Sequence, residues 1–438
     1  MKLLLKSFPI YTILLIVFTL VETLCCTYLL ENGNRIDIVA ITYFIAGLGI
    51  AIIPMIPIKE KIKPPSSNKF TFRFNRILLY SFFAFIVIYF IFFMTGIMQN
   101  HVLDHRFSDT LPQIKVMCNR LLSGEKIYAP IPEIWDGKQP PYMPLMWLPF
   151  TAAEYLGIDI RWTTTLFLLG GIFLTFKILP RNYAGNPFIL ISVFISLFFL
   201  LNFLLVKDRV TLGNTEEGIV IGYYLLLGFA LAKKKPILIG IAIACCLMSR
   251  FALFFWVPMY LLYVFFYESR KNAYIITSVV AVIILFVFLI PFGFKQPEYF
   301  INIPADYKVG VDQAWNYNYN EVSGKYYENS LGYTKYFDIT DIHFLHNFQI
   351  IVAAILPFLC LLLFKLLKNK LKLNQHFFSL CSLKLTLVFF YNMIEVPYYY
   401  LFFVSTFFSY SILFAYLKSG SATIDDIPVA AKLNDNNL

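Results

Sequence analysis

The chain has 438 residues, of which 59% are hydrophobic and 14% are charged. An average soluble domain carries about 25% charged residues, so this composition excludes an ordinary water-soluble globular protein. The net charge of +10 is concentrated in short loops between apolar runs. It therefore indicates membrane topology, and we expect no nucleic-acid partner.

Apolar runs of roughly 20 residues recur along the chain, and each can cross the bilayer as a helix. The first follows Lys2 and Lys6 like a secretory signal, but it is too long and lacks a small-residue cleavage site, so we interpret it as an uncleaved span. We expect an all-α polytopic membrane protein with about twelve transmembrane helices. The predicted spans are 9–30, 36–57, 77–98, 162–178, 187–206, 217–232, 236–250, 251–268, 273–292, 347–368, 377–393 and 396–417.

The loop after the second span carries six basic residues between Lys59 and Arg76, which places it in the cytoplasm. The apolar segment 143–157 is too short for a span and contains two prolines, so we expect it along the outer interface. With that choice the later basic clusters and both termini are cytoplasmic; if the segment spans instead, Lys233–Lys235 falls outside. We expect localisation in the plasma (bacterial inner) membrane, because the richness in Phe, Ile, Lys and Asn hints at a bacterial chain.

This topology leaves three sizeable outer segments, 99–161, 207–217 and 293–346. In the first, apolar residues recur at three- and four-residue spacing from Leu111 to Leu121, and Gly124 follows as a stop signal. This pattern predicts a short amphipathic helix that lies on the membrane.

Asp109 precedes that helix and lies close to the end of the third span. A carboxylate there can accept a proton from a hydroxyl that attacks an activated sugar carbon. The alternative is an N-cap that binds backbone N–H groups, and the residues alone favour neither interpretation. Asp104 is the main competitor for the role of base.

Two further polar positions stand out on the outer side. Asn214 follows Gly213 where the chain re-enters the membrane, and its amide can bind a sugar or a phosphate, although most such loops are solvated turns. Arg250 interrupts a long apolar stretch, where an ionisable residue is costly and usually functional. It can hold a lipid phosphate, or it can extend to the headgroups without a specific partner.

The outer segment 293–346 is rich in tyrosines and amides, a composition typical both of sugar stacking and of an interfacial aromatic belt. The histidines form no zinc motif, and six of the seven cysteines lie in apolar runs, so we expect neither a metal site nor disulfides. The chain has no phosphate-binding or dinucleotide-binding motif, and we expect no cofactor.

The order of these motifs resembles the GT-C class of membrane glycosyltransferases, and within it glycosyltransferase family 87. The resemblance covers roughly residues 77–417. Arg250 stands where the family tends to have lysine, and the hairpin 9–57 looks like an addition. The matching elements are Asp109, Gly124 with Tyr128, Pro140–Leu145, Gly213–Asn214, Arg250 and Glu328–Gly332.

The resemblance implies that Asp109 is the general base, with inversion by direct displacement. It implies a polyprenyl-phosphate hexose donor, mannose being one candidate, and a lipid or glycan acceptor. A transporter or flippase, or a polymerase, of lipid-linked glycans is the alternative. The candidate substrate-binding residues are Arg250, Asn214, Asn329, Tyr128 and Asp104.

We divide the chain into three parts on this basis. Residues 1–76 form a transmembrane hairpin with a basic cytoplasmic loop. Residues 77–417 form a GT-C-like catalytic module with outer-face interfacial helices. Residues 418–438 form a polar cytoplasmic tail.

Overall fold

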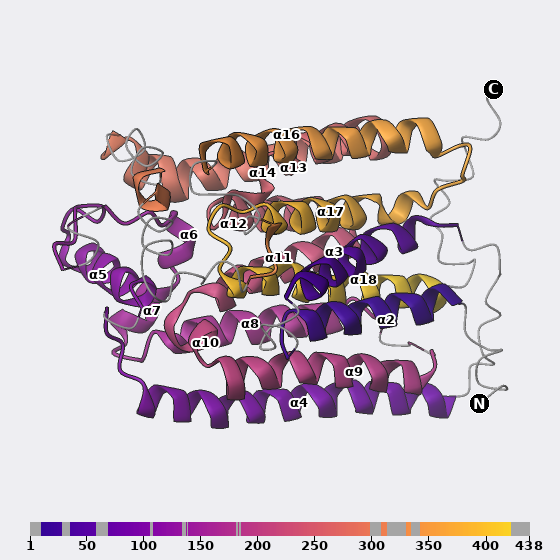
Figure 1. The fold of residues 1–438 in the computed structure, drawn as a ribbon, viewed down its shortest axis with the longest axis horizontal. Coiled ribbons are helices and arrows are strands. Elements are labelled where there is room, and N and C mark those ends of the chain that lie inside the picture. The colour runs from indigo at the N-terminus through magenta and orange to yellow at the C-terminus, as the bar shows by residue number, and fades with distance from the viewer. Residues whose placement is uncertain are drawn as a thin grey trace.

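The computed structural model describes residues 10–28, 36–57, 69–105, 108–133, 137, 139–180, 183, 185–297, 308–312, 330–333 and 342–421. The described residues form helices and turns, and none of them is in a β-strand. The long helices lie side by side in one bundle (Figure 1). The fold is therefore all-α, as predicted.

The helices of the bundle differ widely in length, and several continue directly into short π-helical or 3₁₀ segments. The elements of 12 or more residues are α2 (Ile10–Cys25), α3 (Ile36–Ile52), α4 (Lys69–Asn100), α5 (Thr110–Ser123), α8 (Arg161–Phe176), α9 (Pro187–Asn202), α11 (Glu217–Lys233), α12 (Pro236–Leu247), α14 (Arg270–Ile284), α16 (Ile342–Leu367), α17 (Phe378–Asn392) and α18 (Phe402–Ser421). The shorter ones are η2 (Ile53–Met55), α6 (Pro144–Trp147), α7 (Phe150–Tyr155), η4 (Phe203–Asp208), α10 (Val210–Asn214), η5 (Phe251–Leu253), α13 (Trp256–Tyr263), η6 (Val264–Glu268), η7 (Leu285–Gly293), η11 (Gln375–Phe377) and η12 (Tyr399–Leu401).

Among the described residues, six helical stretches are long and apolar enough to cross a membrane. Helices α2 and α12 are apolar but shorter. Membrane character is thus confirmed, whereas twelve spans and the GT-C fold stay predictions. The six stretches are Asp37–Met55, Arg73–Asn100, Pro187–Asp208, Arg270–Gly293, Phe344–Leu367 and Tyr399–Ser419.

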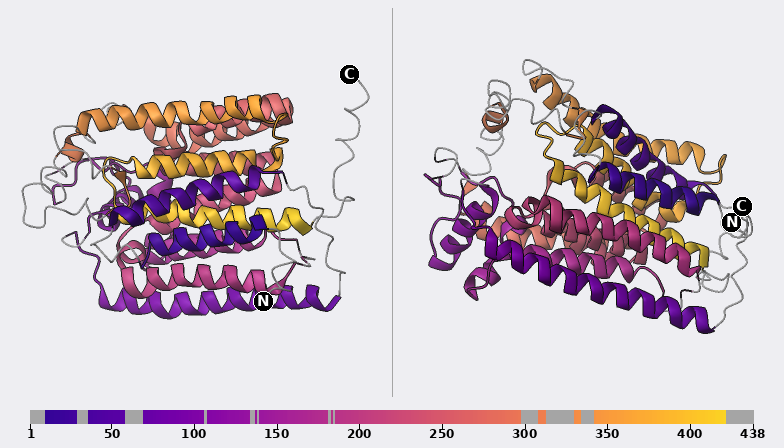
Figure 2. Two further views of the ribbon diagram at one scale, coloured as in Figure 1. Left: turned by 45° about the vertical axis from the view of Figure 1, so that its right-hand side comes forward. Right: turned by 60° about the horizontal axis from the view of Figure 1, so that its bottom comes forward.

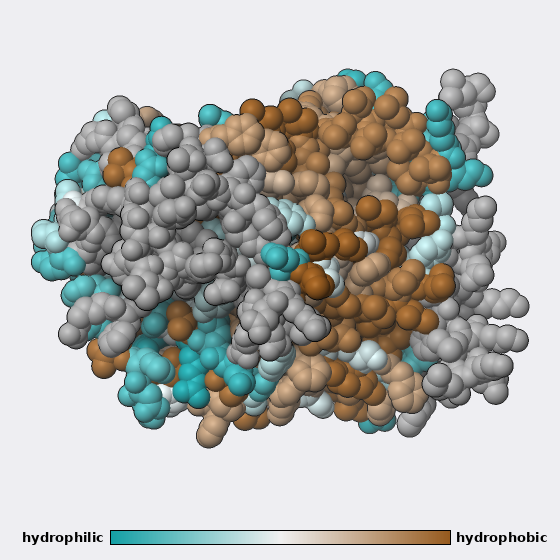
Figure 3. Space-filling view, in the orientation of Figure 1, coloured by the Kyte–Doolittle hydropathy of each residue, from teal (hydrophilic) through white to brown (hydrophobic). Residues whose placement is uncertain are grey.

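These helices divide into a peripheral and a central group. Only 17% of the most apolar window of α4, of α14 with η7 and of α16 is buried, against 94% for α18. Because the exposed faces are apolar, they suit contact with lipid. Figure 3 shows this hydrophobic surface over the bundle, with hydrophilic residues toward both ends.

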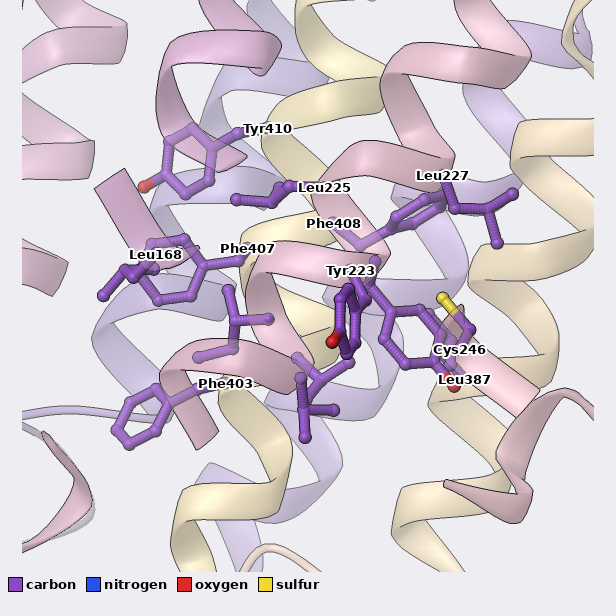
Figure 4. Close-up of a cluster of buried hydrophobic side chains, with 14 of the residues drawn as sticks. Leu168, Tyr223, Leu225, Leu227, Cys246, Leu387, Phe403, Phe407, Phe408 and Tyr410 are labelled. Atoms are coloured by element: carbon purple, nitrogen blue, oxygen red, sulfur yellow. The ribbon is translucent and has the colours of Figure 1, made fainter. Parts of the chain in front are cut away.

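The centre of the bundle is the contact of α11 with α8, α12 and α18. Gly218 and Gly222 lie one turn apart on α11, and a Cβ added there would meet Thr164 O at 2.5 Å or Phe167 O at 2.6 Å on α8. Two glycines at this spacing let the helix backbones approach closely. Large side chains fill the other sides of α11, including Phe407 and Phe408 (Figure 4).

The N-terminal helices pack into the same bundle, because α2 and α3 contact α9, α17 and α18. Glu22 of α2 forms an ion pair with Lys384 of α17, and both side chains are fully buried. Lys384 Nζ also donates to Ser405 O at 2.9 Å and to Ser405 Oγ at 2.8 Å. Ser409 Oγ donates to Glu22 Oε2 at 2.6 Å. The two buried charges are therefore paired and fully hydrogen-bonded.

The two ends of the bundle differ in character. The first residue of α2 and the last of α18 lie at one end, and α5, α6, α7 and α10 lie at the other (Figures 1 and 2). Lysines from several predicted cytoplasmic loops meet at the first end. Lys233 Nζ donates to Ile178 O at 3.3 Å, Lys234 lies 3.7 Å from Glu268, and Lys418 Nζ donates to Ala232 O at 3.4 Å.

The segment 143–157 forms α6 and α7, each far too short to cross a bilayer. The amphipathic helix predicted after Asp109 is α5, and Gly124 ends it with φ +72°. Its apolar face does not contact lipid as a helix resting on the membrane would, because Leu111, Ile114 and Met117 are fully buried within the protein. Helices α6 and α7 cover that side of α5 in place of lipid.

Candidate functional site

The candidate site is built where α5, α11 and the turn after α12 meet. Asp109 precedes α5, and its side chain makes no capping hydrogen bond to that helix. Gln113 Nε2 instead donates to Asp109 Oδ2 at 3.3 Å. Ser108 Oγ donates to Asn214 O at 3.0 Å, which joins this segment to the end of α10. The Asp109 carboxylate is therefore not used as an N-cap, which was one of its two interpretations.

The second component is a charged triad of Glu216, Glu217 and Arg250. Arg250 follows α12 in an extended conformation, with φ −148° and ψ 147°. Its guanidinium nitrogen lies 3.1 Å from Glu216 Oε1 and also pairs with Glu217 Oε1. The side chain of Arg250 is 17% exposed, that of Glu216 5% and that of Glu217 0%. Because two glutamates share one arginine, the ionised triad carries one net negative charge.

Electrostatic interactions connect the triad to Asp109. Burial raises the pKa of Glu216; Arg250 opposes this rise and the Asp109 carboxylate adds to it. Burial also raises the pKa of Tyr142, and the carboxylates of Asp109 and Glu216 raise it further. Burial disfavours the charged form of Arg250, and the nearby carboxylates of Glu217 and Glu216 favour it. Asp109, Glu216 and Tyr142 are therefore close enough to interact electrostatically.

A proline-containing segment holds Tyr142 in this site. Leu145 N donates to Met248 O at 3.1 Å, and Tyr223 OH donates to Leu145 O at 3.1 Å. Tyr128 OH donates to Tyr142 O at 3.2 Å and accepts from Trp147 Nε1 at 3.2 Å. These bonds fix residues 142–148 against α11 and α12.

The structure separates the predicted substrate-binding residues into different surroundings. Arg250 lies in the site, whereas Tyr128 is fully buried behind it and supports the segment 142–148. Asn214 ends α10, and the contact identified there is made by its backbone oxygen. Asp104 lies 3.7 Å from His105. Asn329 is outside the described residues, although the adjacent Ser330 and Leu331 are buried.

Sequence reasoning did not select Tyr142, Tyr391 or Tyr400 as site residues. Tyr391 of α17 and Tyr400 of η12 lie close enough to Arg250 to act on its charge. Tyr400 belongs to the run Glu395–Tyr400, in which polar and aromatic residues separate two apolar stretches. This break on the predicted outer side was the sequence feature that could have indicated a site residue there.

Several buried polar atoms around Arg250 have no hydrogen-bond partner among the described residues. They are Glu217 Oε2, Arg250 Nε, Tyr224 OH and Tyr391 OH. Tyr224 and Tyr391 act electrostatically on each other and on Arg250 and Glu217, so these groups are neighbours. Because an unpaired buried polar group costs about 1–3 kcal/mol, the site suits a ligand or water that offers both donors and acceptors.

Within the part of the chain that the structure describes, no group of three or more His, Cys, Asp and Glu side chains is placed to hold a metal ion. Comparison with protein-family models, with curated proteins and with solved structures found no match.

Proposed function

We propose that the protein is an integral membrane glycosyltransferase that moves a hexose from a polyprenyl-phosphate donor to a lipid or glycan acceptor. The observation that carries the proposal is the position of Asp109. Its carboxylate makes no capping bond to α5 and acts instead on Glu216 and Tyr142 at one end of the bundle. A carboxylate in such surroundings can serve as a general base.

In the proposed reaction, Asp109 accepts the proton of an acceptor hydroxyl while that oxygen attacks the anomeric carbon of the sugar. The new C–O bond forms as the bond from the anomeric carbon to the phosphate oxygen breaks. Polyprenyl phosphate leaves with the bonding electron pair, and the anomeric configuration inverts. No cofactor takes part in this scheme.

Arg250 is proposed to contact the donor phosphate through Nε while one terminal nitrogen, Nη2, holds both glutamates. The Nε atom has no hydrogen-bond partner among the described residues, whereas a terminal nitrogen bonds Glu216 and Glu217. Arginine can donate in several directions at once, because its N–H groups form a planar fork. This arrangement would hold Glu216 opposite Asp109 and leave one N–H group for a phosphate oxygen.

The distribution of basic residues supports placing the site on the non-cytoplasmic side. Lys177, Lys233–Lys235 and Lys418 gather at the end of the bundle opposite Asp109. Cytoplasmic loops carry an excess of Lys and Arg, so we assign that end, and with it both chain termini, to the cytoplasm of a bacterial inner membrane. A polyprenyl-linked donor would then reach Asp109 directly from the outer leaflet.

A flippase or transporter of lipid-linked glycans is the rival proposal. Such a protein tends to expose mid-membrane charges to a pathway for substrate or ions. Here Glu22 and Lys384 are fully buried and bonded to each other and to Ser405 and Ser409. That arrangement favours a structural role for the charges and therefore supports the transferase over the flippase.

The experiment is a product assay with purified protein, a panel of polyprenyl-phosphate hexoses and lipid acceptors, read by mass spectrometry. Asp109→Asn should lower the turnover number by about 10²–10⁴-fold, which is the usual contribution of a general base. Asp104→Asn is the matched control and should stay within a few-fold of the parent. Equal thermal stability of the two variants would show that both are folded.

The outcomes of this assay separate the alternatives. Full activity of Asp109→Asn would remove Asp109 from the mechanism, and a large loss in Asp104→Asn alone would assign the base to Asp104. Movement of the lipid-linked sugar across vesicles without transfer would favour the flippase. Products longer than one added sugar would favour the polymerase.

A further inference from the structure

The segment between α17 and α18 contains three consecutive tyrosines, Tyr398, Tyr399 and Tyr400. The rings of Tyr398 and Tyr400 are parallel, with their centres 5.3 Å apart and 8° between their planes. The Tyr399 ring stands at 75° to the Tyr400 ring, with 5.8 Å between the centres. Both rings of the parallel pair are only partly buried. We call this pair, Tyr398 and Tyr400, the aromatic platform.

The turn that carries the aromatic platform is fastened to two neighbouring elements. Tyr399 OH donates to Asp208 Oδ1 at the end of η4. Glu395, whose side chain is 4% exposed, pairs with His346 of α16. These contacts hold the backbone on both sides of Tyr398, so the fold sets the position of the two rings before a ligand arrives.

The aromatic platform lies beside the triad of Glu216, Glu217 and Arg250. Tyr400 acts electrostatically on Arg250, and both glutamates act on Tyr400. The packing agrees with this, because η5, which directly follows Arg250, contacts α17, the helix that precedes the platform. In a polyprenyl-phosphate hexose the sugar is bonded directly to the phosphate. A donor phosphate held by Arg250 would therefore place the hexose ring next to Tyr400.

The chemistry of the aromatic platform and the triad matches that of a sugar ring. A hexose carries C–H groups on its faces and hydroxyl groups around its edge. The negative face of an aromatic ring attracts C–H groups, and the nearby carboxylates of Glu216 and Glu217 can accept hydrogen bonds from hydroxyls. A tyrosine of an interfacial belt sits at the lipid headgroups instead, whereas Tyr400 lies beside a largely buried charged triad.

We propose that the aromatic platform binds the hexose of the donor, with the sugar ring stacked on Tyr400, and so distinguishes a sugar-bearing lipid phosphate from a bare one. Tyr400 is then a specificity-determining residue, and Tyr398 supports its ring. The inference rests on the proposed function for the identity of the donor. It does not depend on the role of Asp109, because binding can occur without transfer.

The test is binding of two lipids to the full chain in detergent, measured by native mass spectrometry. The lipids are the polyprenyl-phosphate hexose that the parent binds best and the sugar-free polyprenyl phosphate. Tyr400→Leu removes the aromatic ring, so it should lower the affinity for the sugar-bearing lipid about tenfold and leave that for the sugar-free lipid within about twofold of the parent. Tyr400→Phe keeps the ring, and both affinities should stay within about twofold.

Tyr155→Leu is the matched control, because Tyr155 is a 76% exposed tyrosine at the end of α7, outside the aromatic platform. It should leave both affinities within about twofold of the parent. The sugar-free lipid also reports on folding, since an unfolded variant binds neither lipid. If Tyr400→Leu is unfolded, Tyr398→Leu carries the test, with an expected loss of about threefold for the sugar-bearing lipid alone.

Equal losses for the two lipids, or a loss in Tyr400→Phe as large as that in Tyr400→Leu, would overturn the proposal. Unchanged binding in Tyr400→Leu would do the same and would leave the proposed reaction standing. A parent that binds neither lipid would refute the proposed donor and, with it, both proposals. Sugar-selective binding without transfer would keep the aromatic platform and refute the transferase.

Discussion

Removal of one partner of the buried pair Glu22 and Lys384 should destabilise the protein strongly. Lys384→Met leaves the Glu22 carboxylate with only Ser409 as a hydrogen-bond donor, and Glu22→Met leaves the Lys384 ammonium with Ser405 alone. Because both side chains are fully buried, neither remaining charge can turn to water. Breaking a buried ion pair costs about 3–5 kcal/mol, and we expect each single variant to lose that much.

The double variant Glu22→Met/Lys384→Met should lose much less. Replacing both charges with apolar groups of similar volume removes the desolvation cost together with the attraction, and the outcome is often neutral. The Ser409 hydroxyl keeps a partner, since its Oγ also lies 3.2 Å from Ser405 O. The coupling energy of the cycle should therefore be about 3 kcal/mol or more.

The assay is unfolding of the four proteins in mixed micelles, followed by tryptophan fluorescence during SDS titration. The free energy of unfolding should be larger for the double variant than for either single variant. Additive losses in the double variant would refute the view that the two charges stabilise one another. If the single variants are as stable as the parent, the cost of about 3–5 kcal/mol that we expect from the burial of Glu22 and Lys384 is refuted.

Two further predictions concern the elements that position the site. Gly218→Ala should destabilise the protein by about 1–3 kcal/mol, because its Cβ would meet a backbone oxygen of α8 at 2.5 Å. Gly170→Ala is the control and should not destabilise the protein, since its Cβ would meet nothing within 4 Å. Thermal unfolding of the two variants tests the difference. Burial acts to raise the pKa of Asp159, but hydrogen bonds from Arg161 outweigh it and hold that pKa below the usual value for aspartate. The stability from this pair is present above about pH 4 and is lost as the pH falls through the folded-state pKa of Asp159. Asp159→Asn should therefore lower the free energy of unfolding by about 2 kcal/mol at pH 7 and by progressively less below about pH 4, measured as the difference from the parent.

Hydropathy identified most of the helices, because lipid-facing and buried positions are both apolar in a membrane protein. It did not predict the break between Phe251 and Phe255, where the expected span 251–268 begins as a separate 3₁₀ turn. Nor did it predict what covers a helix. The periodicity of α5 was read correctly, but one amphipathic pattern suits lipid and protein equally well, and α6 and α7 supply the covering surface.

Contacts between distant residues limited the prediction of the site. Arg250 and the two glutamates were each visible as charges near apolar stretches, yet 33 and 34 residues separate them, and no local pattern pairs them. Glu22 and Lys384 are 362 residues apart, and no local pattern pairs them either. Such pairs depend on how the helices pack, which periodicity alone does not specify.

The packing of α11 explains why the site lies where it does. Gly218 and Gly222 hold this helix against α8, and its N-terminal residues are Glu216 and Glu217, at the end of the bundle that Asp109 approaches. Carboxylates are stabilised at a helix N-terminus by the helix dipole, which offsets part of the cost of burying two of them beside one arginine. Glu216 is thus the N-cap residue of α11, a central helix of the bundle, and functional groups on rigid elements keep their geometry more closely. Any change that moves α11 relative to α8 should therefore act on the surroundings of Asp109, even from within the bundle.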